Sequence, residues 1–339
     1  MSIDVFVPGR IALLGEHNDW AGGASLALPL PLGVRVQAEP GLYRLELHTT
    51  LEGQVLTGAW APEGEVDPAG GPLRMVPAAA AVLRDHGMGP PPARLWVSST
   101  LPAGRGFSSS AALCGAVLDA LARLAGHALP AVQLAELAYE VEHDRLGVAC
   151  GRLDQLATLL GRGDGQGLQA VLLRWADGQP TAAEAVRPAA PLHLAIGAFP
   201  TPRDTPGILQ TLNRWHSGAA GDPEGVAAVR ACLARWGEAA VAGAEQVRQG
   251  DLRALGQALS EAQRRYEVDL AARLPALAAP GLIRATRALS GSLGAKFSGA
   301  GGDGSIIALY ADAAGAEQGR SILADLGLAA WAVRAGPQG

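Results

Sequence analysis

Residues 8–23 have the sequence PGRIALLGEHNDWAGG, in which a dense group of polar side chains directly follows an apolar run. The run Ile11–Leu14 has the composition of a buried strand, and Glu16, His17 and Asp19 come just after it. Hydrogen-bonding groups gathered at the end of a strand are a common way to hold a polar small molecule. The stretch therefore predicts a strand that ends in a ligand site.

The size and charge of the chain limit the classes of protein to consider. Its 339 residues are enough for two ordinary domains. A net charge of -5 gives no indication of a nucleic-acid-binding protein. Lys296 is the only lysine, so a mechanism with a lysine nucleophile has one candidate.

The cysteines and the apolar segments bear on the location of the protein. Cys114, Cys150 and Cys232 are odd in number and far apart, which favours reduced thiols in the cytoplasm over a disulfide framework. The N-terminal residues lack the pattern of a signal peptide, and no apolar run reaches about 18 residues. We expect a cytoplasmic protein that binds neither membranes nor nucleic acid.

Short strands and longer helices alternate along the chain in a pattern typical of the α+β class. Strands are predicted at residues 32–37, 43–48, 93–98, 192–196, 305–310 and 329–333. Helices are predicted at residues 75–84, 108–126, 130–146 and 153–161, and residues 61–72 have the composition of a turn. The Gly- and Pro-rich residues 177–191 indicate a domain boundary, which gives domains at 1–183 and 184–339.

Two glycine-rich stretches have the composition of phosphate-binding loops. In LPAGRGFSSSAA, residues 101–112, glycines precede three serines at a predicted helix start, where free N–H groups favour an anion. An ordinary Ser-capped helix also fits these serines. In GAKFSGAGGDG, residues 294–304, glycines allow a close approach of backbone to phosphate, although a plain hairpin turn fits equally.

Two carboxylates twelve residues apart are candidates for the chemistry. Glu142 lies late in one predicted helix, and Asp154 lies in the first turn of the next, where the helix dipole favours its ionised form. A carboxylate held ionised can accept a proton from a substrate hydroxyl. Taken singly, each also fits a surface carboxylate.

In this order, the four stretches resemble the GHMP small-molecule kinases, and among them the galactokinase family. GRIALLGEHNDWAGG is similar to the galactokinase signature, LPAGRGFSSSAA to the ATP phosphate loop, and GAKFSGAGGDG to the third motif of the superfamily. VEHDRLGVACGRLDQ resembles the segment that carries the metal-binding Glu and the catalytic Asp. The resemblance implies a two-domain α+β kinase fold with its active site in the cleft between the domains.

The resemblance also implies a role for individual residues. Asp154 would be the catalytic base and Arg10 would steady the hydroxyl and the transferred phosphoryl group. Sugar contacts are implied for Glu16, His17, Asp19 and Gly151. ATP contacts are implied for Pro102, Gly104, Gly106, Ser108, Ser109, Ser110, Gly299 and Gly301. Mg²⁺, the implied cofactor, would be held by Ser110 and Glu142.

The implied reaction is transfer of phosphate from ATP to the anomeric hydroxyl of galactose, by a monomer or homodimer. Alternatives are a kinase for another sugar or for mevalonate, and a non-catalytic regulator that binds sugar and ATP. Mevalonate kinases usually carry Lys where Arg10 stands and lack Asp19. A regulator of this family would have lost Asp154, Glu142 or Ser110, all of which are present.

Three features depart from the family pattern. Trp20 stands where a Tyr is usual, and Asp303 stands where a Gly is common. A carboxylate beside phosphates would repel them unless it points away. Residues 200–215 do not resemble the corresponding galactokinase segment, so no sugar contact carries over there.

Overall fold

The computed structural model of the chain describes residues 2–51, 54–61, 71–102, 105–148, 150–162, 167–201 and 204–337. It divides into two compact units. Unit 1 consists of residues 1–9, 32–103 and 107–162, and unit 2 of residues 10–31, 104–106 and 163–339. The first two strands, β1 (Ile3–Leu14) and β2 (Gly23–Pro40), contribute residues to both units.

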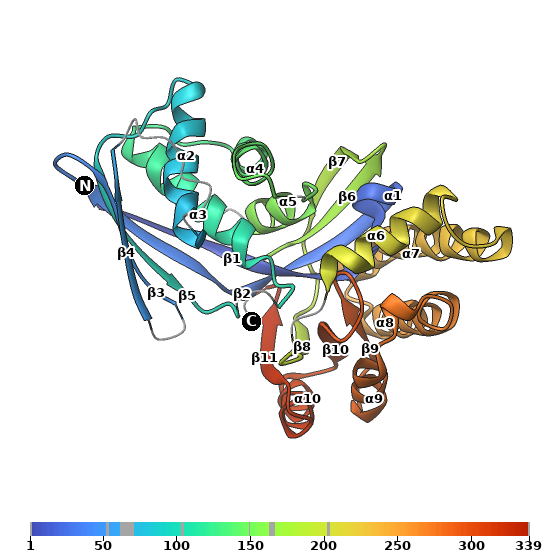
Figure 1. Ribbon diagram of the computed structural model, residues 1–339. Coiled ribbons are helices and arrows are strands. Elements are labelled where there is room, and N and C mark those ends of the chain that lie inside the picture. The colour runs from blue at the N-terminus through green and yellow to red at the C-terminus, as the bar shows by residue number, and fades with distance from the viewer. Residues whose placement is uncertain are drawn as a thin grey trace. The chain divides into compact units, whose positions relative to one another are not determined.

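Unit 1 contains a β-sheet and a group of helices (Figure 1). Besides its parts of β1 and β2, it has β3 (Leu45–Leu51), β4 (Gln54–Trp60) and β5 (Ala93–Ser99). Its helices are α2 (Met75–Asp85), α3 (Ser109–Leu124), α4 (Ala131–Tyr139) and α5 (Leu153–Leu160), with a 3-10 turn η1 (Gly71–Arg74) and a π-helix η2 (Glu140–Arg145). The sheet order is β4-β3-β5-β2, and only the β3–β5 pair is parallel.

The helices of unit 1 form because their sequences supply apolar faces of helical periodicity. In α3 every residue from Cys114 to Ala122 is buried, and the helix packs against α2, α4 and α5. Small residues allow this close approach: a Cβ on Gly115 would lie 3.0 Å from Leu159 of α5. The packing of α3 against α5 fixes the start of α5, where Asp154 lies.

Unit 2 contains the β2-β6-β7 part of a seven-stranded sheet, a separate four-stranded sheet and a set of helices. Its strands after β2 are β6 (Ala170–Ala176), β7 (Gln179–Val186), β8 (Leu192–Ala198), β9 (Gly294–Ser298), β10 (Ser305–Tyr310) and β11 (Ala329–Ala335). Its helices are α1 (Asn18–Ala21), α6 (Thr205–Ser217), α7 (Pro223–Gln249), α8 (Leu252–Arg265), α9 (Pro280–Ala288) and α10 (Ala313–Asp325), with η3 (Tyr266–Ala271) and η4 (Pro275–Leu277). One sheet pairs β2 with β6 and β6 with β7, and the other has the antiparallel order β11-β8-β10-β9.

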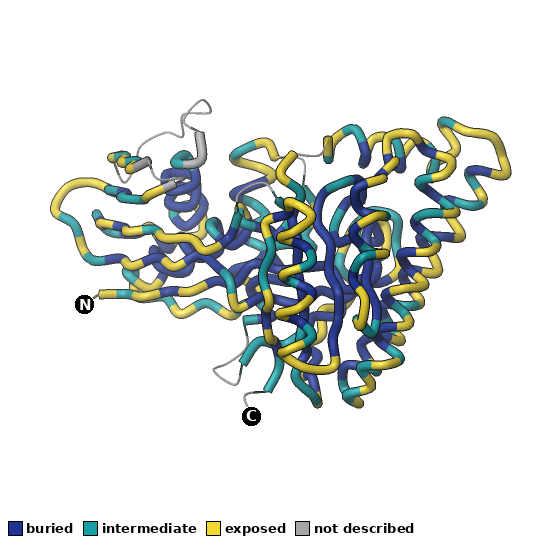
Figure 2. Tube along the Cα trace, turned by 90° about the horizontal axis from the view of Figure 1, so that it is seen from below, coloured by how far each residue is buried: buried dark blue, intermediate teal, exposed yellow. Residues whose placement is uncertain are grey.

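Strands β9 and β10 are buried along their whole length, while the long helices of unit 2 alternate buried and exposed residues (Figure 2). Leu255, Leu259 and Ala262 recur on one face of α8 and are buried where this helix packs on β9. The contact is close because two glycines meet: a Cβ on Gly294 would lie 1.8 Å from the carbonyl oxygen of Gly256. The position of β9 therefore depends on the absence of a side chain at residue 294.

The predicted elements are confirmed, with adjusted ends. The strand expected at 43–48 is β3, which runs from Leu45 to Leu51, and the helix expected at 130–146 is α4 continued by the π-helix η2. Within the predicted turn at 61–72, residues 62–70 lie outside the described ranges. The mixture of antiparallel strands and helices confirms the α+β class.

The compact units are not bounded at residues 183 and 184, where the sequence predicts a domain boundary. Both residues lie within β7, inside unit 2. The turn signal there belongs to a β-hairpin, in which Asp177 and Gly178 adopt positive φ values of 51° and 72° between β6 and β7. The assignment of 1–183 and 184–339 to the two kinase domains stays a prediction.

Two further expectations concern the cysteines and the membrane. Cys114, Cys150 and Cys232 are free thiols, as expected. In the ranges that the structure describes, no helix has both the length and the apolar character needed to cross a membrane.

We expect Gly294→Ala to destabilise the protein strongly, because its methyl group has no space beside Gly256. The free energy of unfolding should fall by about 3 kcal/mol or more, the upper end for overpacking. Gly327→Ala is the matched control: its φ is +83° with open space around it, so it costs only about 1–2 kcal/mol of left-handed strain. Chemical denaturation of both variants is the measurement, and equal losses would contradict the close α8–β9 contact.

Candidate functional site

A π-helical turn positions Glu142 in unit 1. Helix α4 continues directly into η2, whose wider turn adds a residue relative to α-helical spacing. Glu142 in this turn is 2% exposed. The side-chain amide of Gln155, in α5, donates a hydrogen bond of 2.6 Å to Oε2 of Glu142, and the hydroxyl of Ser110, in α3, also bonds this carboxylate. Three helices therefore converge on one buried carboxylate.

The charge of Glu142 is balanced between opposing influences. Burial is the largest and raises its pKa, since a carboxylate loses hydration inside a protein. The hydrogen bonds from Ser110 and Gln155 favour the ionised form, and the negative charge of Asp154 raises the pKa further. A cation at this carboxylate would offset both unfavourable influences.

Asp154 lies in the first turn of α5, as the sequence predicts, and is partly exposed. The negative charge of Asp154 raises the pKa of Glu142, and Ser110 bonds the same carboxylate. Ser110, Glu142 and Asp154 therefore form one cluster. Gly151, predicted to contact substrate, is exposed just before α5.

Cys150 lies beside this cluster. Its sulfur accepts a weak hydrogen bond of 3.7 Å from Gln155. Burial, helped by the charge of Glu142, raises the pKa of the thiol to about 11. The thiolate, which is the nucleophilic form, is therefore rare near neutral pH.

The serine-rich stretch starts α3 without a serine cap. Ser108 is buried and left-handed, with φ 57°, and makes no capping hydrogen bond. Its hydroxyl has no hydrogen-bond partner among the described residues. Ser109 is half-buried and Ser110 is exposed. The side chain of the N-cap serine, Ser108, therefore does not cap the amides at the start of α3.

The rest of this loop is held by Arg10 of β1. Arg10 is 7% exposed, and its guanidinium donates a hydrogen bond of 2.9 Å to the carbonyl of Gly106. Gly106 has φ 82°, a conformation that favours glycine. Pro102 is half-buried before the loop, and Gly104 lies outside the described ranges.

The predicted sugar signature follows β1 in a tight turn of unit 2. Gly15 has φ 82°, and a Cβ there would lie 2.1 Å from the carbonyl oxygen of Ala24. Glu16 is 2% exposed, so this carboxylate is inside the protein rather than on a loop surface. It forms an ion pair with Lys296 of β9, which is 0% exposed.

The side chains after Glu16 form an aromatic cluster. His17 adopts φ 68°, and its ring lies 5.7 Å from that of Trp20 and 6.3 Å from that of Trp236 of α7. Trp20 also meets His216 edge-on at 5.5 Å. Trp20, which replaces the usual Tyr, therefore packs between two histidines. Asp19 in the same turn is half-buried.

The glycine-rich third stretch forms the turn between β9 and β10. Gly299 and Gly301 have φ values of 84° and 89°. The hydroxyl of Tyr266 accepts a hydrogen bond of 2.7 Å from the amide of Gly302, and a Cβ on Gly301 would lie 2.7 Å from the Tyr266 ring. Packing on Tyr266 alone is enough to require glycine at residue 301.

Asp303, the residue that departs from the family pattern, points away from this turn. Its carboxylate accepts hydrogen bonds from the amides of Gly281 and Leu282, at 3.2 and 2.7 Å. These amides lie at the start of α9, so Asp303 caps that helix from a distant part of the chain. Its charge is thereby directed at a helix N-terminus.

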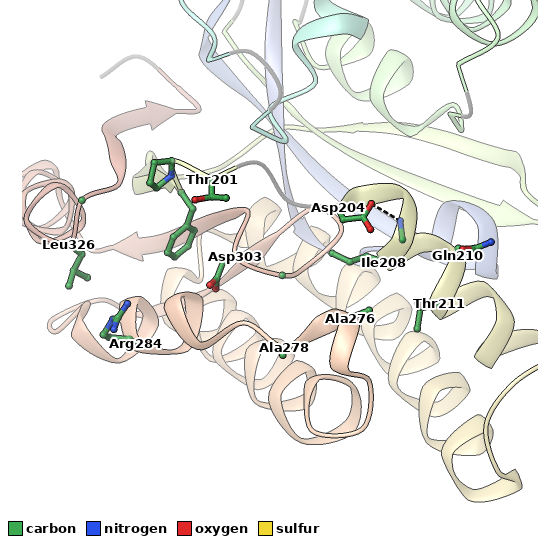
Figure 3. A pocket seen from close by; sticks show the side chains of 15 residues that line it. Thr201, Asp204, Ile208, Gln210, Thr211, Ala276, Ala278, Arg284, Asp303 and Leu326 are labelled. Atoms are coloured by element: carbon green, nitrogen blue, oxygen red, sulfur yellow. Dashed lines mark hydrogen bonds between the residues drawn. The ribbon is translucent and has the colours of Figure 1, made fainter.

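A cavity of about 820 Å³ lies within unit 2 beside this turn (Figure 3). Part of its lining comes from the residues after β8, in the segment 200–215 to which the sequence assigns no role. There Asp204 accepts a hydrogen bond of 3.0 Å from the amide of Gly207 and so caps α6. The residues that line the cavity include Phe199, Pro200, Thr201, Asp204, Ile208, Gln210, Thr211, Arg284 and Asp303.

Within the described ranges, no group of three His, Cys, Asp or Glu side chains could hold a metal ion. The predicted Mg²⁺ ligands, Ser110 and Glu142, do meet. Two oxygen ligands suit Mg²⁺, which keeps several waters and takes few protein ligands.

Sequence reasoning missed two residues of these clusters. Gln155 directly follows Asp154, but an amide there carries no signal of its own. Lys296 does carry a signal in the composition, because a single lysine among 27 Lys and Arg residues indicates a position that does not accept arginine.

Three family models match the chain in order. The galactokinase galactose-binding signature matches residues 3–40, the GHMP kinases N-terminal domain matches residues 74–162, and the GHMP kinases C-terminal domain matches residues 244–327. Together they span more than half of the chain.

Curated relatives with sequence similarity include galactokinases. The chain is 35% identical to that of Mycobacterium tuberculosis over 177 residues, which is 48% of this chain and 44% of the relative. It is 30% identical to that of Thermotoga maritima over 160 residues, or 47% of this chain and 44% of the relative. The match thus spans slightly less than half the length of these relatives.

Solved structures share the fold over almost the whole chain. The galactokinase of Lactococcus lactis in complex with galactose has a TM-score of 0.74 at 21% identity, over 99% of this chain and 94% of the other. The mevalonate kinase of Methanococcus jannaschii has a TM-score of 0.77 at 15% identity, over 99% and 98%. With the three family models in the same order, these likenesses show that the chain belongs to the GHMP kinase superfamily.

Proposed function

We propose that the chain is an ATP-dependent kinase that phosphorylates the anomeric hydroxyl of galactose or of a close stereochemical relative. The observation that carries the proposal is the buried carboxylate of Glu142, bonded by Ser110 and within the electrostatic influence of Asp154. This cluster combines the ligands that the phosphates' cation needs with a carboxylate for proton transfer. The galactose-binding signature at residues 3–40 and the galactokinase relatives support a sugar as the acceptor.

Each group has a separate part in the proposed reaction. Asp154 accepts the proton of the sugar hydroxyl as that oxygen attacks the γ-phosphorus of ATP, whose bond to the β,γ-bridging oxygen breaks so that ADP leaves. Arg10, fixed on the Gly106 carbonyl, steadies the hydroxyl and the transferred phosphoryl group. The amides at the start of α3 and the loop before it bind the phosphates. Ser110 and Glu142 would hold Mg²⁺, which would supply positive charge to neutralise the phosphates.

Recognition of the sugar is assigned to the turn after β1. Glu16, His17 and Asp19 offer acceptors and a donor to hydroxyl groups, with Gly151 as a further contact. Gly299 and Gly301 are the third motif's proposed part of the nucleotide site.

The experiment that discriminates between the candidate functions is a coupled ADP-release screen with galactose, other free monosaccharides and mevalonate. A higher rate of ADP release with mevalonate than with every neutral sugar would refute the sugar assignment. If a sugar binds but no compound is phosphorylated, the result would favour a regulator.

We expect Asp154→Asn to fold normally and to lower kcat by about 10²- to 10⁴-fold, because the amide cannot accept the hydroxyl proton. Asp144→Asn, at an exposed carboxylate ten residues earlier, should keep the wild-type rate. Steady-state kinetics at saturating sugar and ATP measure both. A near-normal rate for Asp154→Asn would remove it as the base.

Glu142→Ala and Ser110→Ala should each raise the Mg²⁺ concentration for half-maximal rate by about 10-fold or more, since even an outer partner of a metal ligand can contribute that much affinity. The control is Glu140→Ala, in the same π-helix, whose carboxylate bonds His86 instead. Rates are measured over a Mg²⁺ titration at fixed ATP. An unchanged half-saturation in both test variants would exclude them from the metal site.

Asp19→Ala should weaken recognition of the sugar while leaving the KM for ATP unchanged. A carboxylate can accept hydrogen bonds from two hydroxyl groups, and a site built this way rejects a deoxy analogue by about 10⁴-fold. The wild type should therefore use 3-deoxygalactose or 4-deoxygalactose poorly, and Asp19→Ala should reduce that preference. Glu224→Ala, an exposed carboxylate of the same unit, is the control. An unaltered sugar KM in Asp19→Ala would contradict this role.

A further inference from the structure

The only lysine of the chain is inside the protein. Lys296 lies on β9 and is 0% exposed. Its ammonium donates hydrogen bonds to Oε1 of Glu16 and, at 2.5 Å, to the carbonyl of Phe297, and lies 4.3 Å from the centre of the Phe297 ring. Lys296 is therefore committed to structure around Glu16 and is not placed as a nucleophile.

This ion pair is costly to bury. Burial raises the pKa of Glu16 and lowers the pKa of Lys296, and the charge of each partner acts against the shift of the other. A hydrophobic pair of similar volume often serves stability as well or better. Stability alone therefore gives a weak reason for two opposite charges at this place.

The two oxygens of Glu16 are in different situations. Oε1 is bound by Lys296, whereas Oε2 is buried and has no hydrogen-bond partner among the described residues. A buried carboxylate oxygen without a donor is uncommon and calls for a ligand or water. Glu16 belongs to the predicted sugar signature, in which His17 and Asp19 follow it.

We propose that Lys296 is a positioning residue for the sugar site: by binding Oε1 of Glu16 it holds Oε2 as the acceptor for one hydroxyl of the substrate. This inference rests on the proposed function. Lysine suits the task because its ammonium is a compact charge that can bind one oxygen, whereas a guanidinium forms a fork that binds both oxygens of a carboxylate. The position therefore requires lysine in a chain whose other basic residues are all arginine.

Substitution of Lys296 separates this role from simple charge balance. Lys296→Met and Lys296→Arg should both raise the sugar KM by about 10-fold or more, the size of effect expected from misplacing a binding group, with the ATP KM unchanged. The arginine variant keeps the positive charge, but its guanidinium would bind both carboxylate oxygens and so leave Oε2 unable to accept a hydroxyl. Since Lys296 acts through Glu16, Glu16→Gln with Lys296→Met should bind sugar no worse than Glu16→Gln alone.

The control is Tyr310→Phe, which removes a buried hydroxyl from the neighbouring strand β10 and should leave both KM values unchanged. A loss of sugar affinity in this control equal to that in Lys296→Met would assign the effect to general packing. A normal sugar KM in Lys296→Arg would show that Oε2 does not need to be open, and would overturn the proposal.

A spectroscopic test needs no variant, so it holds even if the substituted proteins fail to fold. In protein labelled with ¹³C,¹⁵N-lysine, every lysine side-chain signal comes from residue 296. Galactose should shift that signal and a non-hydrolysable ATP analogue should not. If galactose is phosphorylated but leaves the signal in place, the inference about Lys296 fails and the kinase proposal stands. If no sugar is phosphorylated and none shifts the signal, the proposed function fails instead.

Discussion

The Glu16–Lys296 ion pair joins the end of β1 to β9, two segments 280 residues apart in sequence. Moving two charges out of water costs several kcal/mol for each, so the pair forms only where the surrounding backbone is already fixed. Several contacts around it meet that condition: Ser298 bonds the backbone of Ala12, and Gln263 bonds the amide of Phe297. The close packing of α8 on β9 holds the lysine's strand from the other side. The buried pair of charges therefore depends on an ordered backbone in this part of unit 2.

The carboxylate cluster of unit 1 has the opposite electrostatic character. Glu142 and Asp154 are like charges, and the partners that the structure gives Glu142 are a hydroxyl and an amide rather than a cation. Such a cluster is satisfied when a cation is present, whereas the buried charge of Glu16 is already compensated by the protein. The two sites differ in the way that a cation site and a neutral-polyol site should differ.

Local patterns predict the elements of the fold well, because they depend on residues close in sequence. The apolar run 75–85, the alternation at 93–99 and the helical face of 109–124 each specify one element. The extra residue of the π-turn at 140–145 is not visible in this way, since one helix from 130 to 146 has the same apolar spacing. The resemblance to a family supplied the Ser110–Glu142 pair.

Contacts between distant segments carry no local signal. Asp303 has the sequence context of a phosphate loop, yet it caps α9 by accepting hydrogen bonds from two amides 21 and 22 residues earlier. Gln155 and the partner of Lys296 escape prediction for the same reason.

The burial of the single lysine also determines how the surface of the chain responds to chemistry. Apart from Lys296, the side chains that can carry a positive charge are arginines and histidines, and the one ε-ammonium is out of reach of solvent. Acylating reagents, amine-reactive dyes and cross-linkers, and enzymes that acetylate or conjugate lysine, therefore find no side-chain target on the folded chain. Reaction at Lys296 would instead report that β9 has separated from its neighbours, so labelling located at this residue measures opening in this part of unit 2.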